Sequence, residues 1–103
     1  MPNILVVDDK DSLRNMLIET LVEEGYRVDA AEDGTKALDL VRNKSYDLVL
    51  TDLKMPDVDG LSVLSEIKDI DHDTAVIVMT AYGTIEDAVS AMKHGAYDFI
   101  TKP

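Results

Sequence analysis

The chain runs Ile4-Leu5-Val6-Val7-Asp8-Asp9 near its start, four consecutive apolar residues followed by two acids. An unbroken apolar run of this length is typical of a strand buried on both faces, as in a parallel sheet covered by helices. The pattern recurs at residues 48–50 and 75–79, which are expected to form two further central strands. Alternation over residues 26–30 indicates a half-exposed edge strand, and a fifth short strand is expected at residues 97–101.

Helical spacing separates these runs. Apolar residues recur at intervals of three or four positions in residues 13–21, 37–41, 61–67 and 85–92, and a glycine or turn sequence bounds each segment. Strands and helices therefore alternate, which predicts an α/β fold: a doubly wound parallel sheet with right-handed crossovers. Because four helices leave part of such a sheet uncovered, we expect the natural protein to continue past Pro103 into a fifth helix that this chain lacks.

Length and composition narrow the class of protein. The 103 residues fit one domain, so residues 1–103 are expected to form a single domain. Acidic residues outnumber Lys and Arg by 21 to 10, which argues against direct nucleic-acid binding because phosphate contacts need cations. There is no Cys, and no apolar run approaches the ~18 residues of a membrane span. With 46% hydrophobic residues, the sequence predicts a soluble, cytoplasmic globular domain.

Polar side chains follow four of the expected strands. They are Asp8 and Asp9 after the first strand, Asp52 after the third, Thr80 after the fourth and Lys102 after the fifth. Because the carboxyl ends of parallel strands meet at one edge of a sheet, we expect these side chains to converge. Any single acid could instead be a helix N-cap or a solvated loop residue. That alternative does not explain acids, a hydroxyl and an ammonium group at matching strand ends.

The expected cluster has a defined chemistry. Three carboxylates at one edge repel one another, and one ammonium group cannot neutralise them. Oxygen ligands with room for water suit Mg²⁺, or Mn²⁺ in its place, which takes one or two carboxylates plus phosphate oxygens. A carboxylate beside such a cation, with an ammonium and a hydroxyl nearby, is equipped to attack phosphorus and become an acyl phosphate.

Four segments carry a resemblance to a known family. They are Ile4 to Asp9, Asp52-Leu53-Lys54-Met55-Pro56-Asp57-Val58-Asp59-Gly60, Thr80-Ala81 and Lys102-Pro103. In this order, over the whole chain, they resemble the receiver domain of two-component response regulators. The resemblance implies a flavodoxin-like five-stranded sheet in the order 2-1-3-4-5. It also implies a phosphorylation-activated signalling switch, not an enzyme with a separate substrate, although the domain would catalyse its own phosphorylation and dephosphorylation.

The same resemblance implies roles for the acids. Asp52 would be the phosphoacceptor and a ligand of Mg²⁺. Asp9 would bind the cation directly, and Asp8 would bind it mainly through water. The backbone carbonyl of Lys54 would complete the protein ligands.

Further residues would hold and transmit the phosphorylated state. Thr80 and Lys102 would hold the phosphoryl oxygens, and Thr80 would move toward the phosphoryl group as Phe99 swings inward. Many relatives have Tyr where this chain has Phe99, so its coupling must come from packing; the alternative is a plain core aromatic. Lys54 and Tyr82 border the expected path of the attacking water. We predict that both slow hydrolysis, the alternative being that both are only solvent-exposed.

A second, more specific resemblance indicates which process the domain would control. Residues 80–89 and 95–103 are similar to receivers of NtrC-type, sigma-54-dependent transcription activators. This implies a sensor histidine kinase as phosphoryl donor, an effector domain on a longer natural chain and a homodimer through the fourth helix and fifth strand. A stand-alone or phosphorylation-independent interaction module stays open. A flavodoxin-like cofactor or nucleotide binder would need a Gly-rich or hydroxyl-rich first loop, which here reads Asp8-Asp9-Lys10-Asp11.

Overall fold

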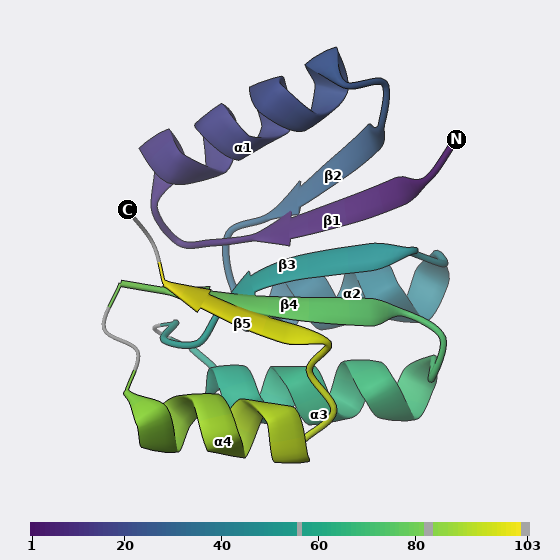
Figure 1. Cartoon of the computed structure of the whole chain (residues 1–103). Helices are drawn as coiled ribbons and strands as arrows, with labels where there is room; N and C mark the ends of the chain where they lie inside the picture. The colour runs from purple at the N-terminus through teal and green to yellow at the C-terminus, as the bar shows by residue number, and fades with distance from the viewer. Residues whose placement is uncertain (56, 82–83, 102–103) are drawn as a thin grey trace.

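The structure is a computed structural model and describes residues 1–55, 57–81 and 84–101. Within these residues five strands alternate with four helices (Figure 1). The strands are β1 (Asn3–Val7), β2 (Arg27–Ala31), β3 (Leu48–Asp52), β4 (Ala75–Thr80) and β5 (Asp98–Thr101). The helices are α1 (Asp11–Glu23), α2 (Gly34–Asn43), α3 (Gly60–Ile70) and α4 (Ile85–Lys93). Every segment predicted from apolar periodicity is present.

The strands form one parallel sheet in the order β2-β1-β3-β4-β5, which confirms the predicted flavodoxin-like topology. Central strand β1 pairs with β2 on one side and β3 on the other, so that Val6 lies between Ala30 and Leu50. The apolar run from Ile4 to Val7 is at most 3% exposed, as an apolar strand covered on both faces requires. Edge strand β2 is only partly buried, as its alternating pattern predicted.

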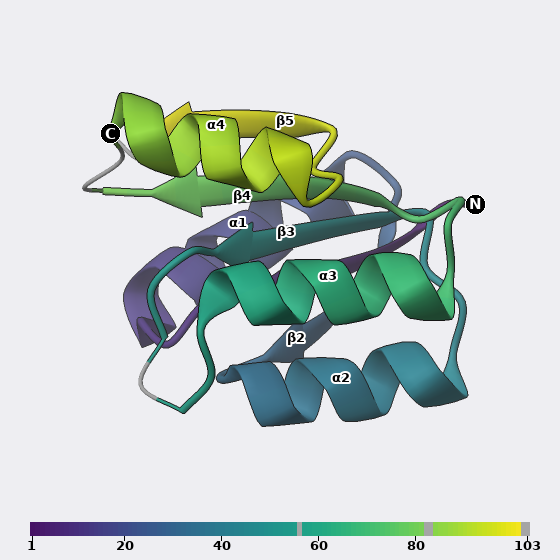
Figure 2. The same ribbon diagram turned by 90° about the horizontal axis from the view of Figure 1, so that it is seen from below.

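The two faces of the sheet are covered unequally. Helices α2, α3 and α4 lie on one face and α1 on the other (Figure 2). The larger core cluster includes Leu5, Val49, Leu64, Ile67 and Val78. The smaller cluster on the α1 face consists of Ile4, Val6, Leu50 and Met79. Helix α1 has no buried residue. The fifth helix expected beyond Pro103 stays a prediction.

Polar side chains set where three of the helices begin. Asp33, Asp59 and Thr84 each accept a hydrogen bond from a backbone amide in the first turn of α2, α3 and α4 respectively. These bonds satisfy donors that the start of a helix otherwise leaves unpaired. The resulting helices are short, and within the described ranges none has the length and apolar character needed to cross a membrane.

Candidate functional site

Three carboxylates meet at the carboxyl-terminal edge of the sheet. Asp8 and Asp9 directly follow β1, and Asp52 is the last residue of β3. One carboxylate oxygen from each of the three residues lies within 4.8 Å of the others. Asp8 is fully buried, Asp52 is 6% exposed and Asp9 is exposed. Adjacent strands β1 and β3 thus bring together the acids that the sequence placed at strand ends.

Hydrogen bonds hold the backbone around Asp8 in place. Its amide donates to the Ala31 carbonyl at the end of β2 (3.1 Å), and its Oδ1 accepts from the Lys10 amide (2.9 Å). The main-chain oxygen of Asp8 accepts from Arg14 Nη1 on α1 (2.7 Å). The Arg14 side chain is only 14% exposed and also pairs with Asp11. These bonds fix the turn that carries Asp8 and Asp9.

The loop between β3 and α3 is held just as closely. Asp52 Oδ1 accepts from the Lys54 amide (3.2 Å), so the carboxylate of one site residue orders the backbone of another. The Gly60 amide donates to the Leu53 carbonyl (3.0 Å), and a Cβ at Gly60 would lie 2.2 Å from that oxygen. No real side chain fits at that distance, so glycine is required where the loop closes on itself. The Lys54 side chain is exposed.

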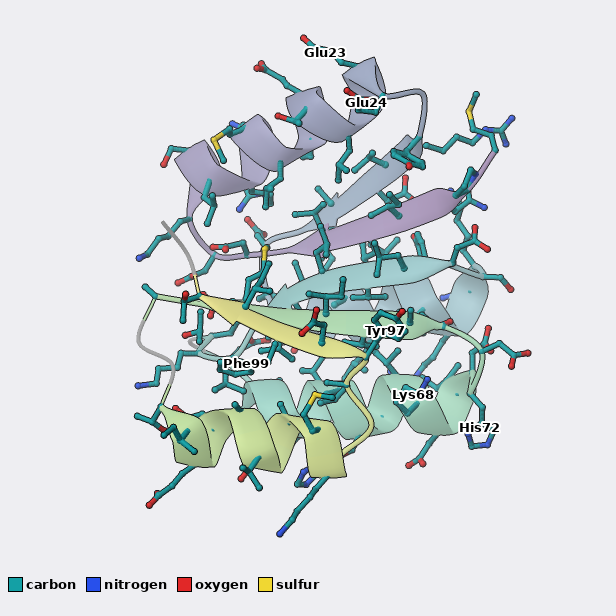
Figure 3. The ribbon with its side chains drawn as sticks, in the orientation of Figure 1. Glu23, Glu24, Lys68, His72, Tyr97 and Phe99 are labelled. Atoms are coloured by element: carbon teal, nitrogen blue, oxygen red, sulfur yellow. The ribbon has the colours of Figure 1, made fainter. Side chains whose placement is uncertain are left out.

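The remaining predicted site residues fall into two groups. Thr80 ends β4, is 1% exposed and lies at the same sheet edge, since Asp52 pairs in register with the preceding residue, Met79. Phe99 on β5 is partly buried and packs against the larger core (Figure 3). Lys102 and Tyr82 lie outside the described residues, so their roles stay predictions.

The donor set fits a small, hard divalent cation. Asp8, Asp9 and Asp52 offer only oxygen atoms, and two of the three carboxylates are nearly or fully buried. Bringing like charges together out of water costs free energy, which a bound divalent cation offsets. Carboxylate and carbonyl oxygens with space for water are the ligands that Mg²⁺ takes in proteins. The cluster therefore has the composition of a site for a divalent cation.

Two residues that contact the loops of this site were not predicted from the sequence. Arg14 bonds to the main chain of Asp8, and its only sequence signal was its position three residues after Asp11 on a helix. Asp57 binds the first turn of α2 from the loop after β3. No local pattern connects Asp57 with a helix more than twenty positions earlier.

The sequence of this chain is similar to that of known proteins over almost its whole length. The family model described as "Response regulator receiver domain" matches residues 4–103. The transcriptional regulatory protein ZraR of Klebsiella oxytoca is 46% identical over 101 residues, which cover 98% of this chain but 23% of ZraR. The sporulation initiation phosphotransferase F of Bacillus subtilis is 41% identical over 100 residues, covering 97% of this chain and 81% of that protein. The chain thus spans about a quarter of ZraR and most of the second relative.

Solved structures give the same similarity in three dimensions. The beryllofluoride-activated NtrC4 receiver domain dimer superposes with a TM-score of 0.94 at 39% identity, covering 100% of this chain and 85% of that chain. A response regulator protein from Burkholderia pseudomallei, solved with a phosphorylated aspartic acid, a calcium ion and citrate, has a TM-score of 0.96 at 32% identity. That match covers 100% of this chain and 61% of the other.

Proposed function

The chain belongs to the response regulator receiver domain family, and on that premise we propose that it is a phosphorylation-activated switch in which Asp52 accepts a phosphoryl group from a sensor histidine kinase. The observation that carries the proposal is the cluster of Asp8, Asp9 and Asp52, whose carboxylate oxygens lie within 4.8 Å of one another. The Burkholderia relative, solved with a phosphorylated aspartic acid and a divalent cation, supports this reading of the cluster.

The proposed reaction is a transfer between two side chains. A carboxylate oxygen of Asp52 attacks the phosphorus of the kinase phosphohistidine, an O–P bond forms, and the P–N bond breaks with its electron pair on the imidazole. Asp8, Asp9, Asp52 and the Lys54 carbonyl would hold Mg²⁺, or Mn²⁺ in its place. When bound, the cation supplies positive charge that offsets the negative charge of the phosphoryl oxygens. The domain supplies its own nucleophile and does not act on a separate substrate.

The proposed switch depends on Thr80 and Phe99. Phosphorylation adds about −1.5 to −2 charges beside the buried Thr80 hydroxyl. Donation from that hydroxyl to a phosphoryl oxygen, with Lys102 as counter-charge, draws the end of β4 toward Asp52. Phe99 then packs further inward as Thr80 moves away. The phosphoryl group shifts the equilibrium only by the contacts that differ between the two states.

The lifetime of the phosphorylated state is assigned to Lys54 and Tyr82. Lys54 is exposed on the loop that follows Asp52, where its side chain restricts the approach of water to the acyl phosphate. Tyr82 occupies the corresponding position two residues after Thr80. Both side chains are proposed to slow hydrolysis.

The proposed output is control of transcription in the bacterial cytoplasm through an effector domain on a longer natural chain. ZraR, named as a transcriptional regulatory protein, supports this output. Helix α4 exposes an apolar stripe suited to pairing of receivers, consisting of Ile85 (85% exposed), Val89 (47%) and Met92 (48%). Tyr97, just before β5, is also exposed, at 73% (Figure 3). A homodimer through α4 and β5 is therefore proposed, in line with the dimeric NtrC4 receiver.

A stand-alone receiver is the second candidate function. It is favoured by one observation, the 81% coverage of the Bacillus phosphotransferase by this chain, since that relative is little longer than the receiver itself. In that case phosphorylated Asp52 would pass its phosphoryl group on or bind a partner protein directly.

Binding of beryllofluoride, an analogue of the phosphoryl group, tests both candidate functions, because both require a phosphoryl group on Asp52. With Mg²⁺ and beryllofluoride, amide resonances of Asp52 and Thr80 are expected to shift most. Asp52→Asn should abolish these shifts, while the control Asp73→Asn, an exposed acid on the loop before β4, should retain them. Folded wild-type protein that shows no shift at either residue would contradict the proposal.

A further inference from the structure

Asp57, in the loop between β3 and α3, binds the first turn of α2. Its Oδ1 accepts from the Gly34 amide (3.1 Å), and its Oδ2 accepts from both the amide (3.0 Å) and the hydroxyl (2.7 Å) of Thr35. Amides at a helix start have no partner within the helix, and the helix dipole favours a negative charge there. These bonds, with the Thr35 hydroxyl as the largest cause, lower the pKa of Asp57 to about 2. The carboxylate is therefore charged at neutral pH.

Close packing accompanies these hydrogen bonds. A Cβ added to Gly34 would lie 2.9 Å from Val63 Cγ2 and 3.0 Å from Val58 Cβ. The loop residue Val58 thus lies directly against the start of α2, and only glycine leaves it room. Both the carboxylate of Asp57 and the side chain of its neighbour hold the loop to the helix.

The segment that joins β2 to α2 also contacts the turn that carries Asp8 and Asp9. The β2–α2 corner is defined here as the three contacting residues Ala31, Gly34 and Thr35, and its Ala31 carbonyl accepts from the Asp8 amide (3.1 Å). On one side the corner is therefore bonded to the turn that carries Asp8 and Asp9. On the other side it is bonded, through Asp57, to the loop that begins at Asp52. The corner bridges the turn that carries Asp8 and Asp9 and the loop that directly follows Asp52.

We propose that Asp57 is a positioning residue for the cation site, fixing the loop that follows Asp52 and carries Lys54 against the turn that carries Asp8 and Asp9. The inference rests on the proposed function, because it takes these segments as the ligands of Mg²⁺. Asp57 is not one of the clustered carboxylates and acts only through the backbone that it holds. Because Mg²⁺ demands nearly ideal octahedral geometry, small displacements of one loop lower its affinity.

A matched control separates positioning from simple stabilisation of α2. The Asp33 carboxylate accepts from the Lys36 amide (2.8 Å) at the start of the same helix, but Asp33 does not belong to the loop after β3. Asp33→Ala and Asp57→Ala each remove one negative charge from the same helix terminus. Only the second variant releases the loop from the β2–α2 corner.

The test is a Mg²⁺ titration of the phosphate-free protein, followed through amide chemical shifts, for the wild type and both variants. Asp57→Ala is expected to weaken Mg²⁺ binding by about tenfold, the usual effect of removing a group that orients a metal ligand. Asp33→Ala should bind Mg²⁺ as the wild type does. Without any metal, the Lys54 amide should exchange with solvent faster in Asp57→Ala than in Asp33→Ala.

Two further variants complete the design. Asp57→Asn keeps one acceptor oxygen and should recover part of the lost affinity. Thr35→Val removes only the hydroxyl bond and should give an intermediate affinity even if Asp57→Ala does not fold. If the wild type binds Mg²⁺ but neither the Asp57 variants nor Thr35→Val weaken it more than Asp33→Ala, the inference is overturned alone. If the folded wild type does not bind Mg²⁺, the proposed function fails as well.

Discussion

Replacing Asp8 by Asn is expected to stabilise the metal-free protein. Asp8 is fully buried, and its carboxylate lies within 4.8 Å of those of Asp9 and Asp52. At a separation of no more than 4.8 Å, two unit charges repel by at least about 3.5 kcal/mol at an effective dielectric constant of about 20. Asn has nearly the same shape and keeps the oxygen that accepts from the Lys10 amide.

The net gain in stability of Asp8→Asn is smaller than the repulsion between carboxylates that the substitution removes. Arg14 donates to the main-chain oxygen of Asp8 and places a positive charge nearby, and Asp9 is exposed to water that screens its charge. We therefore expect the free energy of unfolding to rise by about 1 to 2 kcal/mol without divalent cations. The variant should also lose the stabilisation by Mg²⁺, which in the wild type is expected to reach about 2.7 kcal/mol at 100 times the dissociation constant.

Urea unfolding with and without Mg²⁺ measures both effects. A control variant, Asp69→Asn, removes one exposed acid on α3 and should change stability little in either condition. If Asp8→Asn destabilises the metal-free protein, the carboxylates do not repel as argued. If it retains the full Mg²⁺ stabilisation, Asp8 is not part of the cation site.

Two further predictions concern other parts of the molecule. Asp29 accepts from the Lys44 ammonium (2.8 Å) and the Tyr46 hydroxyl (2.7 Å), which lower its pKa in that order. Asp29 therefore stabilises the fold above its unfolded pKa of about 4, and this contribution is lost as pH falls through its lowered pKa in the folded protein. The free energy of unfolding should accordingly fall less steeply below pH 4 in Asp29→Asn than in the wild type. Since the Asp29–Lys44 ion pair is exposed, Asp29→Asn should lower the free energy of unfolding at neutral pH by roughly 0.5 kcal/mol, measured in urea. Equal acid sensitivity of the wild type and Asp29→Asn would refute this role of Asp29. Lys54→Ala and Tyr82→Ala are each expected to shorten the half-life of phosphorylated Asp52, measured by loss of the phosphoryl mass over time; no acceleration in either would show that these side chains do not shield the site.

The architecture and the acid cluster could be predicted from short-range patterns. Four apolar residues in a row, Ile4 to Val7, can be buried only if both faces of their strand are covered. Alternation with helical segments then implies parallel strands, and parallel strands end at one edge. The proximity of Asp8 and Asp52 follows from that topology alone, without any knowledge of loop conformation.

The contacts around the cluster could not be predicted in this way. Asp57 lies in a polar loop and looks like a solvated acid, because its partners in the first turn of α2 are 22 and 23 positions earlier. Arg14 looks like half of a surface ion pair on a helix, whereas its bond to Asp8 depends on the turn taken after β1. Such contacts are set by loop conformation, which hydrophobic periodicity does not encode.

Helix α1 shows another limit of the sequence pattern. The spacing of Leu13, Leu17 and Leu21 predicts the helix and the face that it turns toward the sheet, yet none of its residues is buried. Periodicity identifies an apolar face, but the degree of burial depends on how much else packs around it. Among the described elements, α1 alone covers that face of the sheet.

The most direct test of the account is the site and cation dependence of phosphorylation. The protein would be incubated with a small-molecule phosphodonor such as acetyl phosphate, with or without Mg²⁺, and analysed by intact mass and peptide mapping. The account predicts a single base-labile, hydroxylamine-sensitive phosphoryl group on Asp52 that forms only with Mg²⁺ and is absent in Asp52→Asn. A phosphoryl group on another residue, or none on folded protein with Mg²⁺ present, would contradict the assignment of Asp52 as the phosphoacceptor.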